Sequence, residues 1–124
     1  MIRQRRAKTA VYVRSDVAGM ELIVEEVGCD PRSYQLGWDR VTRVFAYKRD
    51  CFAIDQICLA IGSDDLEQWI EIAEDDGGFE EILEQLPIRL AGFPVRDEWW
   101  QRVALPPFRT QRTELYRRKR FESF

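Results

Sequence analysis

The chain has 124 residues, of which 45% are hydrophobic and 33% are charged, and its formal net charge is −3. This length fits a single domain spanning residues 1–124, and the composition is that of a folded protein rather than a disordered one. Histidine is absent, which excludes Ser-His-Asp and Cys-His catalysis and zinc sites built on imidazole.

The sequence contains no signal for membrane insertion or secretion. No apolar run approaches the roughly 20 residues that a membrane-spanning helix needs, and the basic start is not followed by an apolar signal segment. The cysteines are odd in number and lack C-x-x-C spacing, which is typical of reduced thiols. We therefore expect a cytoplasmic protein.

Charges are segregated along the chain. Residues 1–14 and 109–124 are basic, whereas the stretch from Asp50 to Ile88 is rich in acids and contains no Lys or Arg. Like charges at this density repel one another unless they are solvated or paired. The basic ends, residues 1–8 and 112–124, are expected to fray, apart from a short ordered part at Leu115 and Tyr116, the only internal apolar pair of residues 109–124.

In chain order, the first predicted elements are strands at residues 9–13 and 20–27, where β-branched residues dominate. Gly28 and the Asp30-Pro31 pair predict a turn over residues 28–33. Three further strands are expected at residues 43–49, 54–61 and 69–74. Short connections between these three strands favour an antiparallel meander.

Period-2 alternation predicts which side chains share a face of these strands. In residues 43–49, one face carries Val44, Ala46 and Lys48, and the other, an aromatic face, carries Phe45, Tyr47 and Arg49. In residues 54–61, one face carries Ile57, Leu59 and Ile61, and the other carries Cys58 and Ala60. In residues 69–74, one face carries Ile70 and Ile72, and the other carries Trp69 and Glu71.

The hydrophobic period then changes to that of a helix. Phe79, Ile82, Leu83 and Leu86 form one apolar stripe, which predicts an amphipathic helix over residues 78–86. Pro87 indicates an end near Leu86, or near Leu90 with a bend. The fold class is therefore predicted as α+β, with an antiparallel sheet packed by one amphipathic helix and a C-terminal aromatic segment across it.

A short second helix is expected at residues 98–104, with Asp97 as its N-cap. Trp99 and Trp100 lie on adjacent rows of this helix, so both can be partly buried although only one needs to be central. We expect the pair to form a lid over the core. If Trp100 is left exposed, it becomes a candidate anchor for a partner.

Two resemblances follow from these patterns. W-x-x-V-x-x-V from Trp38 and G-F-x-x-I-L-x-x-L from Gly78 make residues 36–90 resemble a pleckstrin-homology-like or GRAM-like module, which implies that fold. The string AYKRD-x-F-x2-D-x-ICL, with WW and VA-x-PPF after it, is similar to a group of short bacterial proteins. This second resemblance implies a bacterial origin and carries no activity.

The acidic stretch supplies the main candidate site. As a metal site it lacks the D-x-D-x-D-G spacing of an EF-hand, and as a catalytic pair it lacks an apolar pocket to hold one carboxyl protonated. Neither an enzyme nor a cofactor is therefore expected. A basic protein partner fits this surface better. The partner-binding residues expected are Asp64, Asp65, Glu67, Glu71, Asp75, Asp76, Glu80, Glu84 and Trp100.

The function favoured by the sequence is non-enzymatic protein binding, as an immunity or antitoxin-type inhibitor of a basic, nucleic-acid-targeting partner. The alternative is a small-ligand or lipid-headgroup module in which Lys48 and Arg49 contact an anion. The basic ends could contact nucleic acid, but the acidic middle would repel the same phosphates, so nucleic acid is not the first choice. Opposite charges could also join two copies in a homodimer.

Overall fold

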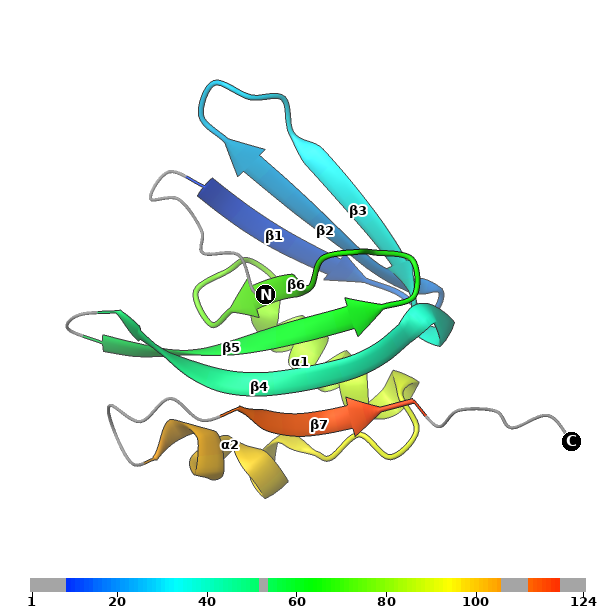
Figure 1. Ribbon diagram of the computed structural model, residues 1–124, viewed down its shortest axis with the longest axis vertical. Coiled ribbons are helices and arrows are strands. Elements are labelled where there is room, and N and C mark those ends of the chain that lie inside the picture. Colours follow the sequence, from blue (N-terminus) through cyan, green and yellow to red (C-terminus); the bar gives the residue numbers. More distant parts are fainter. Residues whose placement is uncertain (1–8, 52–53, 106–111, 119–124) are drawn as a thin grey trace, which may run out of the picture.

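The computed structural model describes residues 9–51, 54–105 and 112–118. It shows an α+β fold with two antiparallel sheets and two helices (Figure 1). The first sheet contains β1 (Thr9–Ser15), β2 (Gly19–Glu26) and β3 (Arg32–Gly37) in that order. The second has the order β6-β5-β4-β7 and contains β4 (Val41–Cys51), β5 (Ile54–Ser63), β6 (Ile70–Ala73) and β7 (Thr113–Arg117).

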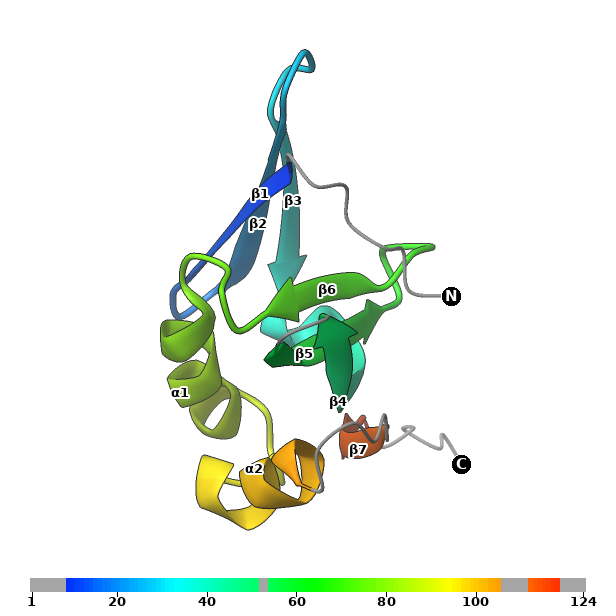
Figure 2. The same ribbon diagram turned by 90° about the vertical axis from the view of Figure 1, so that its left-hand side faces the viewer.

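The helices are α1 (Phe79–Arg89) and α2 (Arg96–Ala104), and a short 3-10 helix, η1 (Trp38–Arg40), leads from β3 into β4. Both α-helices lie on the same side of the second sheet (Figure 2). The main core therefore forms between the helices and the inward faces of the two sheets. Within the described residues, no helix is long and apolar enough to cross a membrane.

The predicted strands at residues 9–13, 20–27, 43–49, 54–61 and 69–74 are confirmed as β1, β2, β4, β5 and β6. Their predicted faces are confirmed as well. Val44, Leu59 and Ile72 belong to the main core, whereas Tyr47 and Cys58 belong to a second, smaller cluster on the opposite face of the sheet.

The turn predicted at residues 28–33 is too long, because β3 begins at Arg32 and pairs with β2. This strand was not predicted. Only Tyr34 and Leu36 are apolar in it, and the pair is too short to show alternation clearly. Both pack toward the core, so burial against β2 stabilises a strand that its own sequence barely marks.

The basic C-terminal region also contributes a strand that the sequence did not predict. Thr113–Arg117 form β7, paired with β4, and this strand contains the short ordered part expected at Leu115 and Tyr116. The register shifts between Val44 and Phe45, so Leu115 is buried and Tyr116 also packs against the core, as a bulge allows. Residues 1–8 and 119–124 lie outside the described residues.

The first helix takes the longer of its two predicted ends, because α1 runs to Arg89 with Pro87 inside it and Leu90 as its C-cap. Proline removes one backbone donor, but the next turn still closes, since the Leu90 N–H donates to the Leu86 carbonyl at 2.9 Å. The predicted cap of α2 is wrong. Val95 is the N-cap, with no side-chain cap, and Asp97 lies in the first turn, where the helix dipole favours an acid.

A backbone contact joins the first sheet to the turn before α1. The Val13 N–H donates to the Gly77 carbonyl at 2.8 Å, and the Gly77 N–H donates to the Val11 carbonyl at 3.2 Å. The next residue, Gly78, has φ +86° and caps α1. A Cβ there would overlap the carbonyl oxygen of Val13. The two glycines therefore let α1 start directly against β1.

We expect Gly78→Ala to destabilise the fold more than Gly92→Ala does. Both positions have positive φ, which costs an alanine about 1–2 kcal/mol, but a Cβ at Gly92 meets open space whereas one at Gly78 meets the β1 backbone. Urea denaturation measures the difference as a shift in midpoint. Equal shifts for the two variants would show that the contact with β1 does not constrain the fold.

Candidate functional site

The acidic residues of the β5–β6 connection form ion pairs with arginines from other parts of the chain. Asp64 pairs with Arg118, which follows β7, and Asp65 accepts hydrogen bonds from Arg40 of η1 at 2.8–3.1 Å. Arg118 lowers the pKa of Asp64, and Asp65 raises the pKa of Arg40. These two carboxylates are therefore largely neutralised within the molecule. Glu67, also from the predicted site, is exposed.

Glu71 lies in a buried cluster on the outward face of the second sheet, which is the face opposite the helices. It accepts a hydrogen bond from the Tyr47 hydroxyl and pairs with Arg49 at 2.5 Å, and only 7% of its side chain is exposed. Burial, together with the hydrogen bond to Glu71, raises the pKa of Tyr47. Glu71 therefore joins β6 to β4, and partners at the surface have little access to it.

Lys48 and Arg49, the predicted anion contact, lie on opposite faces of β4. Lys48 is 3% exposed and donates to the carbonyl of Ala104, the last residue of α2, at 3.0 Å. A cation at this point stabilises the C-terminal end of a helix. Arg49 also donates to Gln56 at 3.2 Å. The structure therefore does not bring the two cations together at a surface anion site.

The acids around α1 divide into two groups. Asp76 accepts a hydrogen bond from the Ala73 N–H at 2.7 Å and so stabilises the turn before the helix. The others are exposed and form what we call the acidic ridge, which consists of Asp75, Glu80, Glu81 and Glu84. Glu80 pairs with Arg96 of α2 at 2.7 Å. In the described part of the chain, no ion pair involves Asp75, Glu81 or Glu84.

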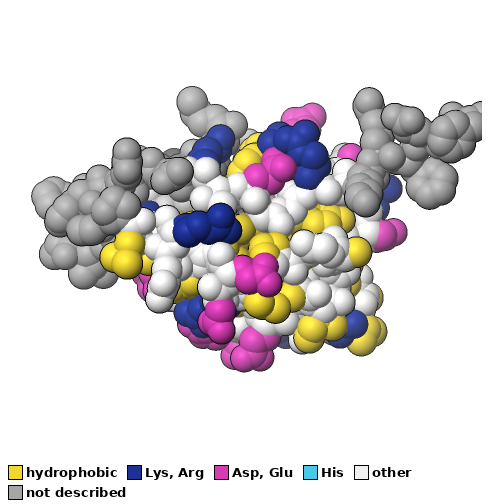
Figure 3. Space-filling view, turned by 90° about the horizontal axis from the view of Figure 1, so that it is seen from below, with side chains coloured by type: hydrophobic (Ala, Val, Ile, Leu, Met, Phe, Trp, Pro, Cys, Tyr) yellow, Lys and Arg dark blue, Asp and Glu magenta, His cyan; other side chains and the backbone are white. Residues whose placement is uncertain are grey.

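On the face of the molecule that carries α2 and β7, the acidic side chains do not form one continuous surface (Figure 3). Figure 3 views the molecule from the side of α2 and β7 and shows acidic side chains interleaved with basic and hydrophobic ones. Of the residues predicted to bind a partner, Asp75, Glu80 and Glu84 lie in the acidic ridge, whereas Asp64, Asp65 and Glu71 are paired elsewhere.

The two tryptophans of α2 have different environments. Trp99 is 1% exposed and lies in the main core, so the predicted lid over the core is formed by this residue. Trp100 is only partly buried, and the Arg96 guanidinium lies 4.0 Å from its ring centroid. Phe79 packs edge-on against Trp100, with a centroid distance of 6.4 Å. Trp100 thus lies between the core and the surface, beside the arginine that pairs with Glu80.

Strand β7 brings the basic end of the chain next to β4. Glu114 pairs with Arg43 of β4 at 2.8 Å and with Arg117 at 3.0 Å. These two guanidinium groups, Arg117 first, lower the pKa of Glu114 to about 2. The sequence analysis did not identify this cluster, because its members come from strands far apart in the sequence and β7 was not predicted.

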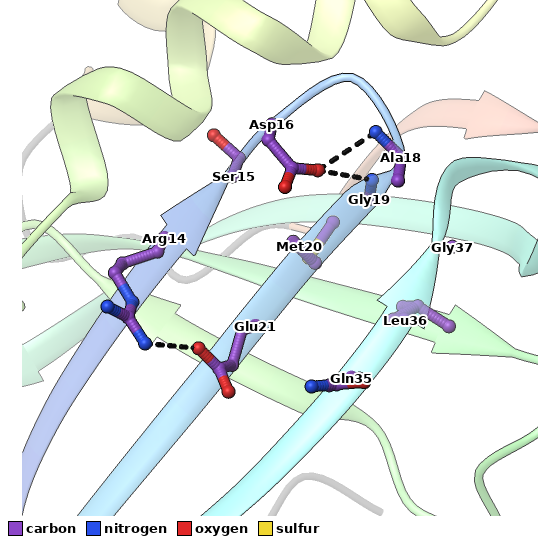
Figure 4. Close-up of a pocket in the computed structure, with 10 residues that line it drawn as sticks. All are labelled: Arg14, Ser15, Asp16, Ala18, Gly19, Met20, Glu21, Gln35, Leu36 and Gly37. Carbon is purple, nitrogen blue, oxygen red and sulfur yellow. Dashed lines mark hydrogen bonds and ion pairs between the residues drawn. The ribbon is translucent and has the colours of Figure 1, made fainter.

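An open hollow of about 600 Å³ lies on the first sheet around the β1–β2 turn (Figure 4). Asp16 accepts hydrogen bonds from the backbone N–H groups of Ala18 and Gly19. Glu21 pairs with Arg14 at 2.5 Å and accepts from the Ser33 hydroxyl at 2.8 Å. The charged groups of the hollow therefore have partners within the first sheet, Arg14 and Glu21 in each other and Asp16 in the backbone of the turn, and none of them points to a ligand.

In the described residues, no group of three or more His, Cys, Asp or Glu side chains could hold a metal ion. Comparisons of the chain with protein-family models, with curated proteins and with solved structures found no match. The pleckstrin-homology-like resemblance stays a prediction.

We expect Glu71→Gln to lower the free energy of unfolding by about 1–3 kcal/mol, because it neutralises the buried carboxylate that pairs with Arg49 and accepts a hydrogen bond from Tyr47. Asp65→Asn is the matched control. It breaks an ion pair in which each side chain is more than 40% exposed, and we expect it to cost less than about 1 kcal/mol. Urea denaturation compares the two. A cost for Glu71→Gln no larger than that of the control would contradict the structural role of the cluster.

The pKa of Glu114 predicts a pH-dependent contribution to stability. A carboxyl whose pKa is depressed by folding stabilises the fold above its unfolded pKa, near 4.5, and that contribution is lost as the pH falls through about 2. Carbon-13 NMR of the Glu114 carboxyl should give a midpoint near 2, and Arg117→Gln should raise it. A midpoint near 4.5 in the unmodified chain would show that the arginines are not paired with it.

Proposed function

We propose that the protein is a non-enzymatic binding module that uses the acidic ridge to hold a basic protein partner, as an immunity or antitoxin-type inhibitor does. The observation that carries the proposal is the exposed face of α1. Glu80, Glu81 and Glu84 all point away from the core, and in the described residues only Glu80 has a basic partner. A field from several unpaired carboxylates speeds the encounter with a basic protein and orients it.

The apolar residues at the two ends of the connection between the helices support a protein partner rather than a simple cation. Ile88 near the end of α1 and Val95 before α2 are 68% and 51% exposed. Exposed apolar side chains next to a charged ridge are the composition expected of a protein interface, with anchors inside and charges at the rim. The partly exposed Trp100 offers a further anchor of the type that dominates binding energies.

The alternative function, a small-ligand or lipid-headgroup module, has less support. It relied on Lys48 and Arg49 as an anion contact, and these residues bind the end of α2 and Glu71 instead. That the partner acts on nucleic acid is inferred from charge complementarity alone. A protein that binds phosphates has a basic groove, and an acidic helix complements such a groove.

The test compares two variants of equal charge. Glu80→Gln/Glu81→Gln/Glu84→Gln removes three carboxylates from α1, and Glu25→Gln/Asp30→Asn/Asp39→Asn removes three exposed carboxylates elsewhere. Each chain is immobilised and exposed at low salt to an extract of its native host, and the retained proteins are quantified by mass spectrometry. We expect one basic protein to be retained by the unmodified chain and by the control, and lost by the α1 variant and at high salt.

Retention of the same protein by both variants would remove the acidic ridge from the interface. Failure of the unmodified chain to retain any basic protein would overturn the proposal as a whole. Addition of the purified chain to the captured protein then tests inhibition, because an inhibitor should suppress the activity of its partner at equimolar amounts.

A further inference from the structure

The outward face of the second sheet carries an aromatic pair on a floor of small residues. On β5 the outward positions are Cys58, Ala60 and Gly62, so larger side chains from the neighbouring strands can extend over them. Trp69 lies over Gly62, where an added Cβ would come within 2.9 Å of its ring. Phe45 of β4 meets Trp69 with a centroid distance of 5.5 Å. Both rings are partly exposed.

Two arginines lie over the Phe45 ring. The guanidinium carbon of Arg43 is 4.5 Å from the ring centroid, and that of Arg112, just before β7, is 5.4 Å from it. Arg43 shares Glu114 with Arg117, whereas Arg112 is exposed and, within the described residues, has no carboxylate partner. One edge of this sheet face therefore carries a partly exposed aromatic ring, Phe45, with two arginine side chains over it.

Rings and guanidinium groups in this arrangement fit a polymer that alternates flat bases with phosphates. Bases stack on exposed aromatic side chains and on arginine planes, and arginines bind the phosphates between them. The rings lie on a sheet rather than on a protruding helix, so they can reach bases only where these are unpaired. We propose that the outward face of the second sheet, at Phe45, Trp69, Arg43 and Arg112, binds single-stranded RNA.

Glu114 favours RNA over DNA at this face. Glu114 is the residue opposite Phe45 in the β4–β7 register, and among the described residues its Oε1 accepts one hydrogen bond, from Arg117 at 3.1 Å. A free acceptor position repels a phosphate but accepts a ribose 2′-hydroxyl, which DNA lacks. The face is also separate from the acidic ridge, because α1 lies on the opposite side of the sheet (Figure 2).

The test uses fluorescein-labelled oligouridine of about 15 nucleotides, a length in the range that one binding domain covers. Fluorescence anisotropy is measured with the full chain between about 50 mM and 200 mM salt. We expect binding that weakens with salt, quenching of tryptophan fluorescence, and weaker binding of the matching oligothymidine. Phe45→Leu should lower the affinity for RNA about tenfold, because it removes one stacking contact.

Arg112→Gln tests the phosphate contact. It should lower the slope of log affinity against log salt by about 0.7, the value of one phosphate contact to a single strand. Arg102→Gln, which removes an exposed arginine from α2, is the matched control and should leave RNA binding unchanged. Glu114→Gln should reduce the preference for RNA over DNA.

Absence of binding at low salt would overturn the proposal, as would equal losses for Arg112→Gln and Arg102→Gln. Competition by polyglutamate as strong as that by RNA at equal charge would show that the face binds an acidic peptide instead. The Glu80→Gln/Glu81→Gln/Glu84→Gln variant should bind RNA normally, so failure at one face is distinguishable from failure at the other.

Discussion

The rest of the structure depends on the contact between β1 and the Gly77-Gly78 pair. β1 lies at the edge of a three-stranded sheet that has no hydrogen-bonded partner strand in the second sheet. Its backbone bonds to Gly77 are therefore a direct connection from the first sheet to the chain that leaves β6. They also fix where α1 begins, because Gly78 caps that helix while packed on Val13. With the helix start fixed, the apolar stripe must face the core, and Glu80, Glu81 and Glu84 must face solvent.

The topology resolves the charge segregation of the sequence. The acidic middle would repel itself if it stayed in one region, but the β4–β7 pairing brings the C-terminal arginines beside it, and Arg118 reaches Asp64. Arg40 and Arg49 neutralise Asp65 and Glu71 in the same way. Acids that lie close together in the sequence therefore form ion pairs with different arginines in the structure. Among the described acids of this run that form no ion pair, Glu67 lies in the β5–β6 connection, whereas Asp75, Glu81 and Glu84 lie at α1 or just before it. No described strand that carries arginines packs against the outer face of this helix.

Much of the fold could be predicted because alternation and helical period are local properties. The faces of β4, β5 and β6 and the stripe of α1 follow from residues a few positions apart. The prediction failed where burial depends on a distant partner. β3 has two apolar residues and β7 has one buried leucine, so their stability comes from β2 and β4. Asp97 failed as a cap because the helix begins two residues earlier than predicted, at Arg96, and this places Asp97 inside the first turn.

The candidate site was harder to predict than the fold, and Lys48 and Arg49 show why. As neighbours in sequence they suggest one anion site, but alternation along a strand sends consecutive side chains to opposite faces. Lys48 therefore meets the end of α2 inside the molecule, and Arg49 meets Glu71 on the outward face. The same alternation places Arg43 and Phe45 on that outward face. Residues two apart on a strand, together with those opposite them on the next strand, therefore define a surface that no contiguous motif shows.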